Sequence, residues 1–378
     1  MRRLRLVHFF CVAAAVVGLK TAAHAEIVAW SPSSTDAGAI RARLKIDARD
    51  IDLDLRVIKP SASPRPAPLL VETGKGDAFV PVATLRNMTT AKIDLSTLSE
   101  DQRVPALIDL ITKLKKDSGA AHVLAHGDAT TSALLITNAA LFDGLLLENT
   151  SAASLPKTLR VITLFDAEGL ARLNPDAMNR KSALANQRRF YLAGASLASP
   201  SADTSCKTLI NAASADPARR ALLVMLEDWL RGVSPPPSRF PNVADLTLAR
   251  LLNWPKIPNL PPPPADDRPA VKIDLDGNET SGLCMPDQAL PVATFVSFNA
   301  QRDKSGKPCA GGVLLPFPAM RAAREASNDP RLSLMERYGS RAYFVATLRV
   351  IADKLVREKL LLPQDADAYV AAGKVAPF

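Results

Sequence analysis

The stretch VLAHGDAT, Val123 to Thr130, decides the fold. An apolar strand over 121–126 leads directly into a turn at Gly127, and a helix is expected from about 129 to 140. On both sides of this unit, short apolar strands alternate with amphipathic helices. The expected strands cover 51–59, 68–73, 144–148, 159–165 and 189–193, and a helix between 99 and 117 begins with a capping-box pattern. This alternation predicts an α/β fold, with a mostly parallel sheet and helices on both faces.

After residue 200 the chain changes character and becomes rich in helices and prolines. Asp216 is expected to cap a helix with Pro217 in its first turn, and Gly232 lies just past the end of that helix. Prolines at 235–237 and 261–264 favour extended connections. The prolines therefore predict joints between elements rather than breaks between domains.

Two more helices are expected near the C-terminus. Ser333 and Glu336 form a capping-box pattern before a long helix, and a final helix is expected over 364–372, ended by Gly373. We expect this proline-jointed, helix-rich C-terminal segment to pack on the sheet. An independent C-terminal domain is the alternative.

The N-terminal residues have the three parts of a secretory signal peptide. A basic start, Met1 to Arg5, precedes an apolar run over 6–19 and an Ala-His-Ala site that ends at Ala25. The run is shorter than the roughly 20 residues of a membrane-spanning helix. We therefore expect residues 1–25 to be a signal peptide, the mature chain to have no transmembrane segment, and the protein to be periplasmic or secreted.

The charge of the chain argues against a nucleic-acid partner. Removal of the expected signal peptide takes away four basic residues and no acid, so the formal charge falls from +9 to +5. The remaining basic residues are spread along the chain without a long basic run. We expect no nucleic-acid binding.

Three cysteines follow the expected cleavage site: Cys206, Cys284 and Cys309. At most one disulfide can then form within the chain. Cys284 and Cys309 bracket a loop with turn residues and are the expected pair, although three pairings are possible. No Cys-x-x-Cys pair occurs, so neither a zinc cluster nor a thioredoxin-like redox site is indicated.

Several runs in the second half carry a resemblance to one family. They are DWLRG at 228–232, DLDGNETSG at 274–282, LPVAT at 290–294, PFP at 316–318 and DPRLS at 329–333. Together with looser matches at 142–144 and 189–194, they resemble secreted bacterial α/β-hydrolase-domain proteins of unassigned substrate. The resemblance implies an α/β-hydrolase-like core over 26–232 and a family-specific C-terminal segment over 233–378.

The resemblance also implies where a catalytic triad would stand. An α/β-hydrolase holds its nucleophile between small residues in a strained strand-to-helix turn. Here Ala125 and Ala129 take the two small positions, two residues before and two residues after Gly127, so Gly127 occupies the nucleophile position. The acid position falls on Asp166 or Glu168, and the base position, just after an Ala-Gly pair, falls on Leu197. Glycine and leucine supply neither a nucleophile nor a base.

A count of histidines leads to the same expectation without any alignment. His122 and His126 are the only histidines after the expected signal peptide, and both lie on the strand before the turn. A triad base must come from a loop after the last strands so that it can reach the nucleophile. The sequence therefore predicts that a conventional triad is absent.

Other residues near the turn also carry groups that take part in catalysis or metal binding in other proteins. Asp128 is an alternative nucleophile that would form an aspartyl ester, but this register places bulky His126 where a small residue is needed. Ser132 is expected to pack or to face solvent. His122, His126 and Asp128 could be imagined as metal ligands, but the turn at Gly127 breaks their common face. We expect no metal and no other cofactor.

The expected pocket lies around the same turn. Thr73 and Gly74 stand where the resemblance places the oxyanion loop, and they are grouped with His126, Gly127 and Asp128 as pocket residues. A plain turn is the alternative for this loop. The acidic run at 274–279 is expected to be a turn organised by side-chain hydrogen bonds, with calcium binding as the alternative.

These observations predict an exported α/β-hydrolase homologue that is non-catalytic and binds a small apolar molecule or a partner protein. The first alternative is an esterase-like or lactonase-like hydrolase that uses non-standard residues. The second is a structural protein of the cell envelope.

Overall fold

The computed structural model describes residues 25–32, 38–60, 66–74, 77–152, 155–173, 178, 185–198, 211, 213–261, 265–297 and 312–378. Nearly all of the expected signal peptide, together with Cys206 and Cys309, therefore lies outside the described residues. No helix in the described part of the chain is both long enough and apolar enough to cross a membrane.

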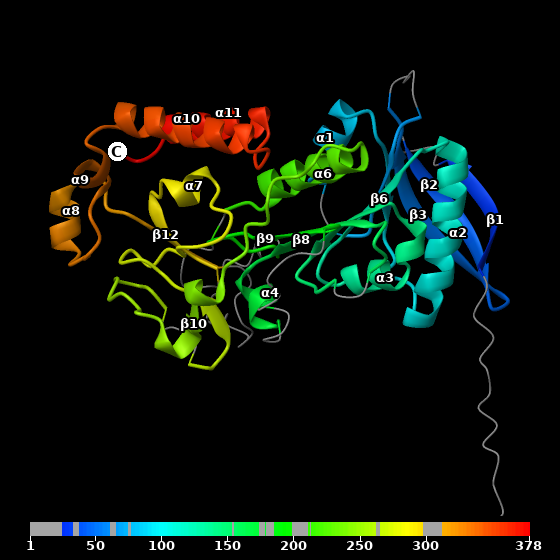
Figure 1. Ribbon diagram of the computed structural model, residues 1–378, viewed down its shortest axis with the longest axis horizontal. Coiled ribbons are helices and arrows are strands. Elements are labelled where there is room, and N and C mark those ends of the chain that lie inside the picture. The colour runs from blue at the N-terminus through cyan, green and yellow to red at the C-terminus, as the bar shows by residue number, and fades with distance from the viewer. Residues whose placement is uncertain are drawn as a thin grey trace, which may run out of the picture.

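A nine-stranded sheet forms the centre of the molecule, in the order β1-β2-β3-β5-β4-β6-β7-β8-β9 (Figure 1). Strands β5, β4, β6, β7, β8 and β9 are parallel, whereas β1, β2 and β3 pair antiparallel at one side. Their bounds are β1 Ala25–Pro32, β2 Ala39–Ile46, β3 Arg49–Ile58, β4 Leu69–Glu72, β5 Thr89–Ile93, β6 Val123–Gly127, β7 Gly144–Glu148, β8 Arg160–Phe165 and β9 Gln187–Tyr191. The predicted mostly parallel sheet is confirmed.

Burial explains why the two parts of the sheet differ in sequence. All residues of β4, β6 and β7 are buried, because helices cover both faces, and these strands are nearly continuous apolar runs. Strands β2 and β3 alternate between buried and exposed residues. Their exposed face carries cross-strand ion pairs, Arg41 with Asp54 and Arg43 with Asp52. One face of this antiparallel part therefore remains in solvent.

Four helices cover the two faces of the parallel strands (Figure 1). On one face, α1 (Val80–Leu85) and α6 (Asp216–Leu230) share a hydrophobic cluster with Leu70, Leu124 and Leu146. On the other face, α2 (Glu100–Ser118) and α3 (Ser132–Thr137) pack on the alternate residues of the same strands. The predicted covering of both faces is confirmed, and so is the capping box at the start of α2.

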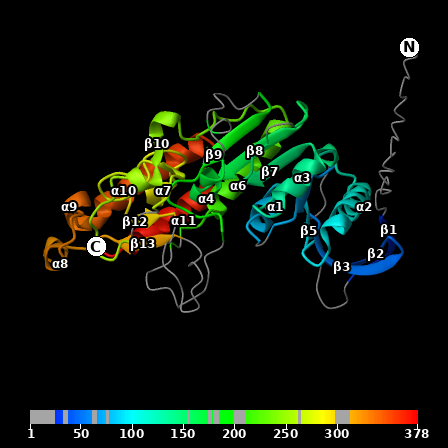
Figure 2. The same cartoon turned by 90° about the horizontal axis from the view of Figure 1, so that it is seen from below.

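The C-terminal segment packs along the β9 end of the sheet and gives the molecule an elongated shape (Figure 2). Its elements are η2 Val243–Asp245, β10 Leu246–Leu248, η3 Ala249–Leu251, β11 Pro269–Val271, α7 Pro286–Ala289, β12 Ala293–Val296, β13 Val313–Pro316, α8 Arg321–Ala326, α9 Leu334–Tyr338, α10 Arg341–Arg357 and α11 Pro363–Lys374. Leu355 of α10 and Leu360 belong to the same hydrophobic cluster as Phe190 of β9 and Leu222 of α6. The segment therefore shares the core of the sheet, as expected, while the boundary at residue 232 stays a prediction.

Several expected element boundaries are wrong. The Ser333–Glu336 capping box begins the short helix α9, and the long helix α10 has its own cap at Ser340. The last helix begins at Pro363 and continues through Gly373 to Lys374. Gly373 stays within the helix and packs closely against Leu348 of α10. Asp216 is the first helical residue rather than the N-cap.

The helix expected over 129–140 is shorter than predicted, and three strands of the central sheet and the four strands of the C-terminal segment were not predicted. The helix consists of α3 followed by a separate 3-10 turn, η1 (Ala139–Leu141). The unpredicted strands are β1, β2 and β5 in the sheet and β10, β11, β12 and β13 in the C-terminal segment.

Candidate functional site

The candidate site lies at the carboxyl ends of β4 and β6, which are neighbours in the sheet. The chain leaves β4 towards α1 on one face and leaves β6 towards α3 on the other. Strands whose connections leave to opposite faces create a crevice at their carboxyl ends, where ligands of α/β proteins commonly bind. The sequence prediction placed the pocket at this point.

A cleft of about 460 Å³ opens beside this crevice, between the β5–α2 loop and the turn after β6. It is lined by Thr73, Gly74, Lys92, Ile93, Asp94, Leu95, Ser96, Arg103, Asp128, Thr130, Thr131 and Leu134. Three of the five expected pocket residues, Thr73, Gly74 and Asp128, line the cleft. His126 and Gly127 are buried residues of β6 and do not line it.

The turn after β6 differs from a nucleophile elbow. Gly127 is the last residue of the strand and does not have the positive φ that a strained turn could require of a glycine. A Cβ at this position would lie 2.8 Å from Leu135 Cδ1 and 3.0 Å from Ser132 Cα. A serine would therefore fit here only if the Leu135 side chain and the start of α3 shifted by a few tenths of an ångström. The position has no nucleophile and is crowded for any side chain.

Asp128 is held by its own turn. Its Oδ1 accepts hydrogen bonds from the backbone N–H and the hydroxyl groups of Thr130 and Thr131, at 2.6–3.2 Å. Burial raises the pKa of this carboxyl, but the bonds from Thr130 and Thr131 outweigh burial and lower it. A carboxylate that accepts this many hydrogen bonds is stabilised as an anion and is a weak nucleophile. The geometry therefore gives no support to the aspartyl-ester alternative.

Two neighbouring hydroxyl groups are also engaged within the turn. Ser132 is fully buried and donates to the Gly127 carbonyl at 2.8 Å, so it packs rather than faces solvent. The Thr131 hydroxyl accepts a hydrogen bond from the Asp128 N–H at 3.1 Å and lies 2.9 Å from the Thr73 hydroxyl. In a hydrolase, the N–H of the residue after the nucleophile points at the oxyanion. Here the corresponding N–H, that of Asp128, already donates its hydrogen bond to the Thr131 hydroxyl.

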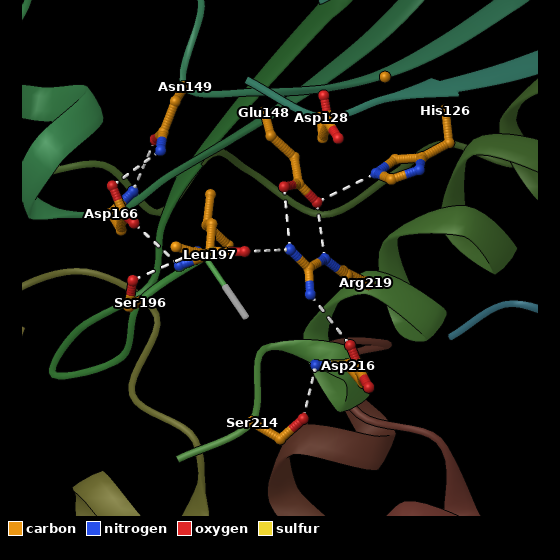
Figure 3. A network of polar contacts seen from close by, with 12 residues as sticks. His126, Asp128, Glu148, Asn149, Asp166, Ser196, Leu197, Ser214, Asp216 and Arg219 are labelled. Atoms are coloured by element: carbon orange, nitrogen blue, oxygen red, sulfur yellow. Dashed lines mark hydrogen bonds and ion pairs between the residues drawn. The ribbon is translucent and has the colours of Figure 1, made fainter. Parts of the chain in front are cut away.

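Asp166 and Leu197, at the acid and base positions that the resemblance implies, lie side by side (Figure 3). The Asp166 carboxylate is buried and accepts a 2.8 Å hydrogen bond from the backbone N–H of Leu197. It also accepts bonds from the Gly169 N–H and the Asn149 amide, both at 2.9 Å. Burial raises the pKa of Asp166, although these three N–H donors act in the opposite direction. Asp166 therefore contacts main chain where a triad acid would contact an imidazole.

Glu168, the other candidate acid, lies away from this group. Its side chain is 67% exposed and pairs with Arg172 one helical turn along, at 2.7 Å. Of the two acids that the sequence left open, the structure brings only Asp166 to the base position.

The sequence prediction missed a row of charged side chains that crosses the carboxyl edge of the sheet. The last polar residues of β5, β4, β6 and β7 are Lys92, Glu72, His126 and Glu148. Glu72, His126 and Glu148 point to the face that α1 and α6 cover, because each follows by two residues a leucine on that face. Lys92 points to the same face, because its neighbours Ala91 and Ile93 face the other side. Arg219 of α6 completes the row. The signal was present in the sequence as a polar residue near the end of each apolar strand.

The bonds within this row are short and buried (Figure 3). Arg219 binds both oxygens of Glu148, at 2.6 and 2.9 Å, and also donates to the Leu197 carbonyl at 2.7 Å. His126 Nε2 lies 3.0 Å from Glu148 Oε1. Arg219 therefore ties together the end of β7, the base position and, through Glu148, the imidazole of His126.

The two carboxyl groups on either side of His126 have opposite properties. Burial would raise the pKa of Glu148, but the hydrogen bonds from His126 and Arg219 outweigh burial and lower it to about 2. Burial raises the pKa of Glu72 to about 7, and the nearby charges of His126 and Lys92 only partly oppose this. Glu148 is therefore a fixed anion, whereas Glu72 changes its protonation state near neutral pH.

The remaining sequence candidates fall outside the site. His122 precedes β6, about four strand residues from His126, and thus on the order of 13 Å away along the strand. Among the residues that the structure describes, no group of three or more His, Cys, Asp or Glu could hold a metal ion. Asp274 accepts the backbone N–H groups of Asp276 and Asn278, so the run at 274–279 is the predicted hydrogen-bonded turn. The pairing of Cys284 with Cys309 stays a prediction, since Cys309 is outside the described residues.

The topology and the carboxyl-edge site define an α/β-hydrolase-type protein. A model of the alpha/beta hydrolase domain family matches residues 171–371. The match covers more than half of the chain, so the chain belongs to this family. A comparison with curated proteins found no match.

The solved structures that match parts of this chain include esterases and serine hydrolases. A thermostable esterase is 12% identical, with a TM-score of 0.31, over 41% of this chain and 54% of that protein. A lidless α/β serine hydrolase from Xanthomonas campestris is 13% identical, with a TM-score of 0.30, over 40% and 83%. An α/β serine hydrolase homologue from Coxiella burnetii is 11% identical, with a TM-score of 0.31, over 48% and 92%. The chain spans about half the length of the thermostable esterase, and at these identities the likeness concerns the fold alone.

Proposed function

We propose that this protein is an exported α/β-hydrolase homologue that does not hydrolyse esters and binds a small apolar ligand in the cleft beside β4 and β6. One observation carries the proposal: the buried Asp166 carboxylate bonds the backbone N–H of Leu197, where a triad would have an imidazole. An imidazole is needed there to take the proton of a nucleophile. No histidine follows residue 126, so no other part of the chain can supply one.

The neighbouring positions support the same proposal. Gly127 has no nucleophile and is crowded by Leu135 and Ser132, and the Asp128 N–H that an oxyanion would use is hydrogen-bonded to the Thr131 hydroxyl. The cleft remains open and includes the apolar side chains of Ile93, Leu95 and Leu134. Loss of the reaction together with retention of the cleft favours binding. The size of the cleft favours a small molecule over a partner protein.

The proposal is tested by turnover and binding measured on the same sample. The purified protein should hydrolyse p-nitrophenyl acetate no faster than a heat-denatured control, and a fluorophosphonate probe should not label it. Robust turnover that disappears in Asp128→Asn would overturn the proposal and favour the aspartyl nucleophile.

Binding is followed with the fluorescence of N-phenylnaphthylamine, an apolar dye. The dye should brighten with the protein, and Leu134→Trp should abolish the effect by filling the cleft. Leu85→Trp, at an exposed position on α1, is the matched control. A dye response that is equal in both variants would show that the cleft is not the binding site. Co-purification of a second protein without any dye response would favour the partner-protein alternative.

Export is a separate part of the proposal. Secretion of the chain should yield a mature protein that begins at Glu26 in the periplasmic or extracellular fraction. N-terminal sequencing of that fraction tests this, and an uncleaved N-terminus would contradict it.

A further inference from the structure

Two arginine side chains share one indole ring at the amino ends of β8 and β9. The guanidinium carbon of Arg160 lies 5.5 Å from the centre of the Trp229 ring, and that of Arg188 lies 5.0 Å from it. Arg160 is the first residue of β8, Arg188 is the second residue of β9, and Trp229 is near the end of α6. One arginine over an indole is a common contact, but two over the same ring also bring two positive charges together.

The strands place both arginines on one face of the sheet. Arg188 is paired with Ile162, which lies two residues after Arg160, so the arginines are diagonal neighbours on adjacent parallel strands. Their Cα atoms are therefore about 8 Å apart, from the spacing of strands and the rise per residue. Ile162, and Phe190 two residues after Arg188, belong to the hydrophobic cluster under α6, so both arginines point towards that helix.

Neither arginine has a carboxylate partner in the described part of the chain. Arg188 donates to two backbone carbonyls, at 2.8 and 3.1 Å. Burial lowers its pKa, and no nearby carboxylate opposes this effect. The Asp143 carbonyl accepts the backbone N–H of Arg160 at 3.1 Å, but the Asp143 carboxylate accepts the backbone N–H of Val123 at 2.8 Å. The two guanidinium charges are therefore not neutralised by a described residue.

The acidic residues at this end of α6 are already engaged. Glu227 and Asp228 directly precede the indole, and both pair with Arg86. Glu227 also pairs with Arg231. Together with the two arginines on the indole, this end of the helix has four guanidinium groups and two carboxylates. The local excess is two positive charges.

We propose that Arg160 and Arg188 bind a phosphate monoester at this face of the sheet. A phosphate monoester carries about two negative charges, which matches the local excess. Its oxygens point in several directions, so one phosphate can accept hydrogen bonds from two guanidinium groups that do not share a plane. A carboxylate has two oxygens in one plane, which suit a single guanidinium. The chemistry therefore favours phosphate over carboxylate.

The two arginines keep enough donors to hold this group. A guanidinium has five N–H donors, and Arg188 uses only Nε and one terminal nitrogen for the backbone carbonyls. Both side chains are partly exposed, whereas Trp229 is 9% exposed. A phosphate from solvent would therefore meet two guanidinium groups that are supported by a buried indole.

This phosphate site is separate from the cleft beside β4 and β6. Helix α6 lies against β7 and β8 (Figure 1). Arg219, near its start, binds Glu148 at the carboxyl edge of the sheet. Trp229 lies about 15 Å further along the helix, at the amino ends of the strands. The proposal is therefore independent of the proposed function.

The test compares inorganic phosphate at about pH 8, where it is a dianion, with sodium chloride of equal ionic strength. Binding to the folded state should raise the melting temperature in a saturable way, and chloride should not reproduce this. Arg160→Gln and Arg188→Gln should each weaken the apparent affinity about tenfold or more, because each removes charged hydrogen bonds. Arg321→Gln, which alters an exposed arginine paired with the exposed Glu325 on α8, is the matched control and should keep the response.

A second measurement does not depend on the folding of the arginine variants. The fluorescence of Trp229 should change when phosphate binds, because its ring contacts both guanidinium groups. Trp229→Phe should remove this signal while phosphate still raises the melting temperature. Equal effects of phosphate and chloride on the wild-type protein would overturn the site. An equal phosphate response of the wild type and folded Arg160→Gln and Arg188→Gln would overturn it as well.

Vesicles distinguish the two sources of a phosphate monoester. Phosphatidic acid presents this group on a membrane, so vesicles of phosphatidylcholine are compared with and without it. Sedimentation that requires phosphatidic acid and is lost in Arg160→Gln would identify a lipid headgroup. Binding of inorganic phosphate without vesicle binding would identify a soluble phosphate ester. Both outcomes support the site, and the absence of both would overturn it.

Discussion

Replacement of Glu72 by glutamine should remove a large part of the pH dependence of stability. The folded protein holds the pKa of Glu72 at about 7, against 4.5 for the free side chain, because the carboxyl is buried without a hydrogen-bond partner for Oε1. A raised folded pKa means that the fold favours the protonated acid. The contribution of this group is therefore complete below pH 4.5 and is lost as the pH rises through 7.

The size of the effect follows from the shift. A rise of about 2.5 pH units is worth about 3.4 kcal/mol in total. Most of it is expressed between pH 5 and pH 8, where linkage gives a loss of about 2.5 kcal/mol. Glutamine keeps the shape of the side chain but does not titrate, so its own burial cost is the same at every pH. Glu148 does not contribute to the change in stability between pH 5 and pH 8, because its pKa is lowered to about 2 and its contribution is lost only at acid pH.

The assay is urea unfolding of the wild-type protein and Glu72→Gln across this pH range, with Glu325→Gln as the control. The difference in unfolding free energy between wild type and Glu72→Gln should change by about 2.5 kcal/mol from pH 5 to pH 8, in favour of the variant at high pH. The control should follow the wild type. Parallel curves for wild type and Glu72→Gln would refute the reasoning, since they would show that Glu72 has the same pKa in the folded and unfolded chains.

Three further predictions follow from the same region and from the packing of the C-terminal segment. Gly127→Ser should lower the free energy of unfolding by about 1–3 kcal/mol without adding esterase activity, because the new side chain meets Leu135 and the backbone of α3. A variant that is as stable as the wild type and has measurable turnover would contradict this crowding. Arg219→Leu should cost about 3–5 kcal/mol in denaturant melts, because Glu148 would stay buried without its cation, and a loss below about 1 kcal/mol would show that Glu148 finds another partner. A fragment covering 26–232 should aggregate, because its β9 and α6 side chains lose their cover, and a soluble fragment with a cooperative melt would identify an independent domain.

The parallel half of the sheet could be predicted because its signal is local. Strands β6, β7 and β8 are buried on both faces and therefore read as short apolar runs between turns. Strand β5 could not be found in this way. It is a short run, TTAKI, in which threonine and lysine interrupt the apolar pattern, and its place is set by pairing with β3 and β4.

The position of the candidate site could be predicted, but the contacts within it could not. The resemblance implied Asp166 or Glu168 as the acid position and Leu197 as the base position, and the structure brings Asp166 and Leu197 into contact, because the order of strands and loops fixes which residues meet at the carboxyl edge. Their roles as former triad positions stay a prediction. The bond between Arg219 and Glu148 joins residues 71 positions apart, and no local pattern reports such a contact. The backbone conformation at Gly127 could not be predicted from the sequence either, because a glycine is compatible with both a strained turn and an ordinary one.

The shared hydrophobic cluster of β9, α6 and the C-terminal helices has a consequence for how the chain is made. Phe190 and Leu222 are synthesised well before Leu355 and Leu360, which cover them in the finished molecule. Until α10 has folded onto them, β9 and α6 have no cover for this part of their surface. A chain that lacks α10 exposes this apolar surface to chaperones and proteases, so the stability of β9 and α6 depends on a segment that is more than 100 residues further along the chain.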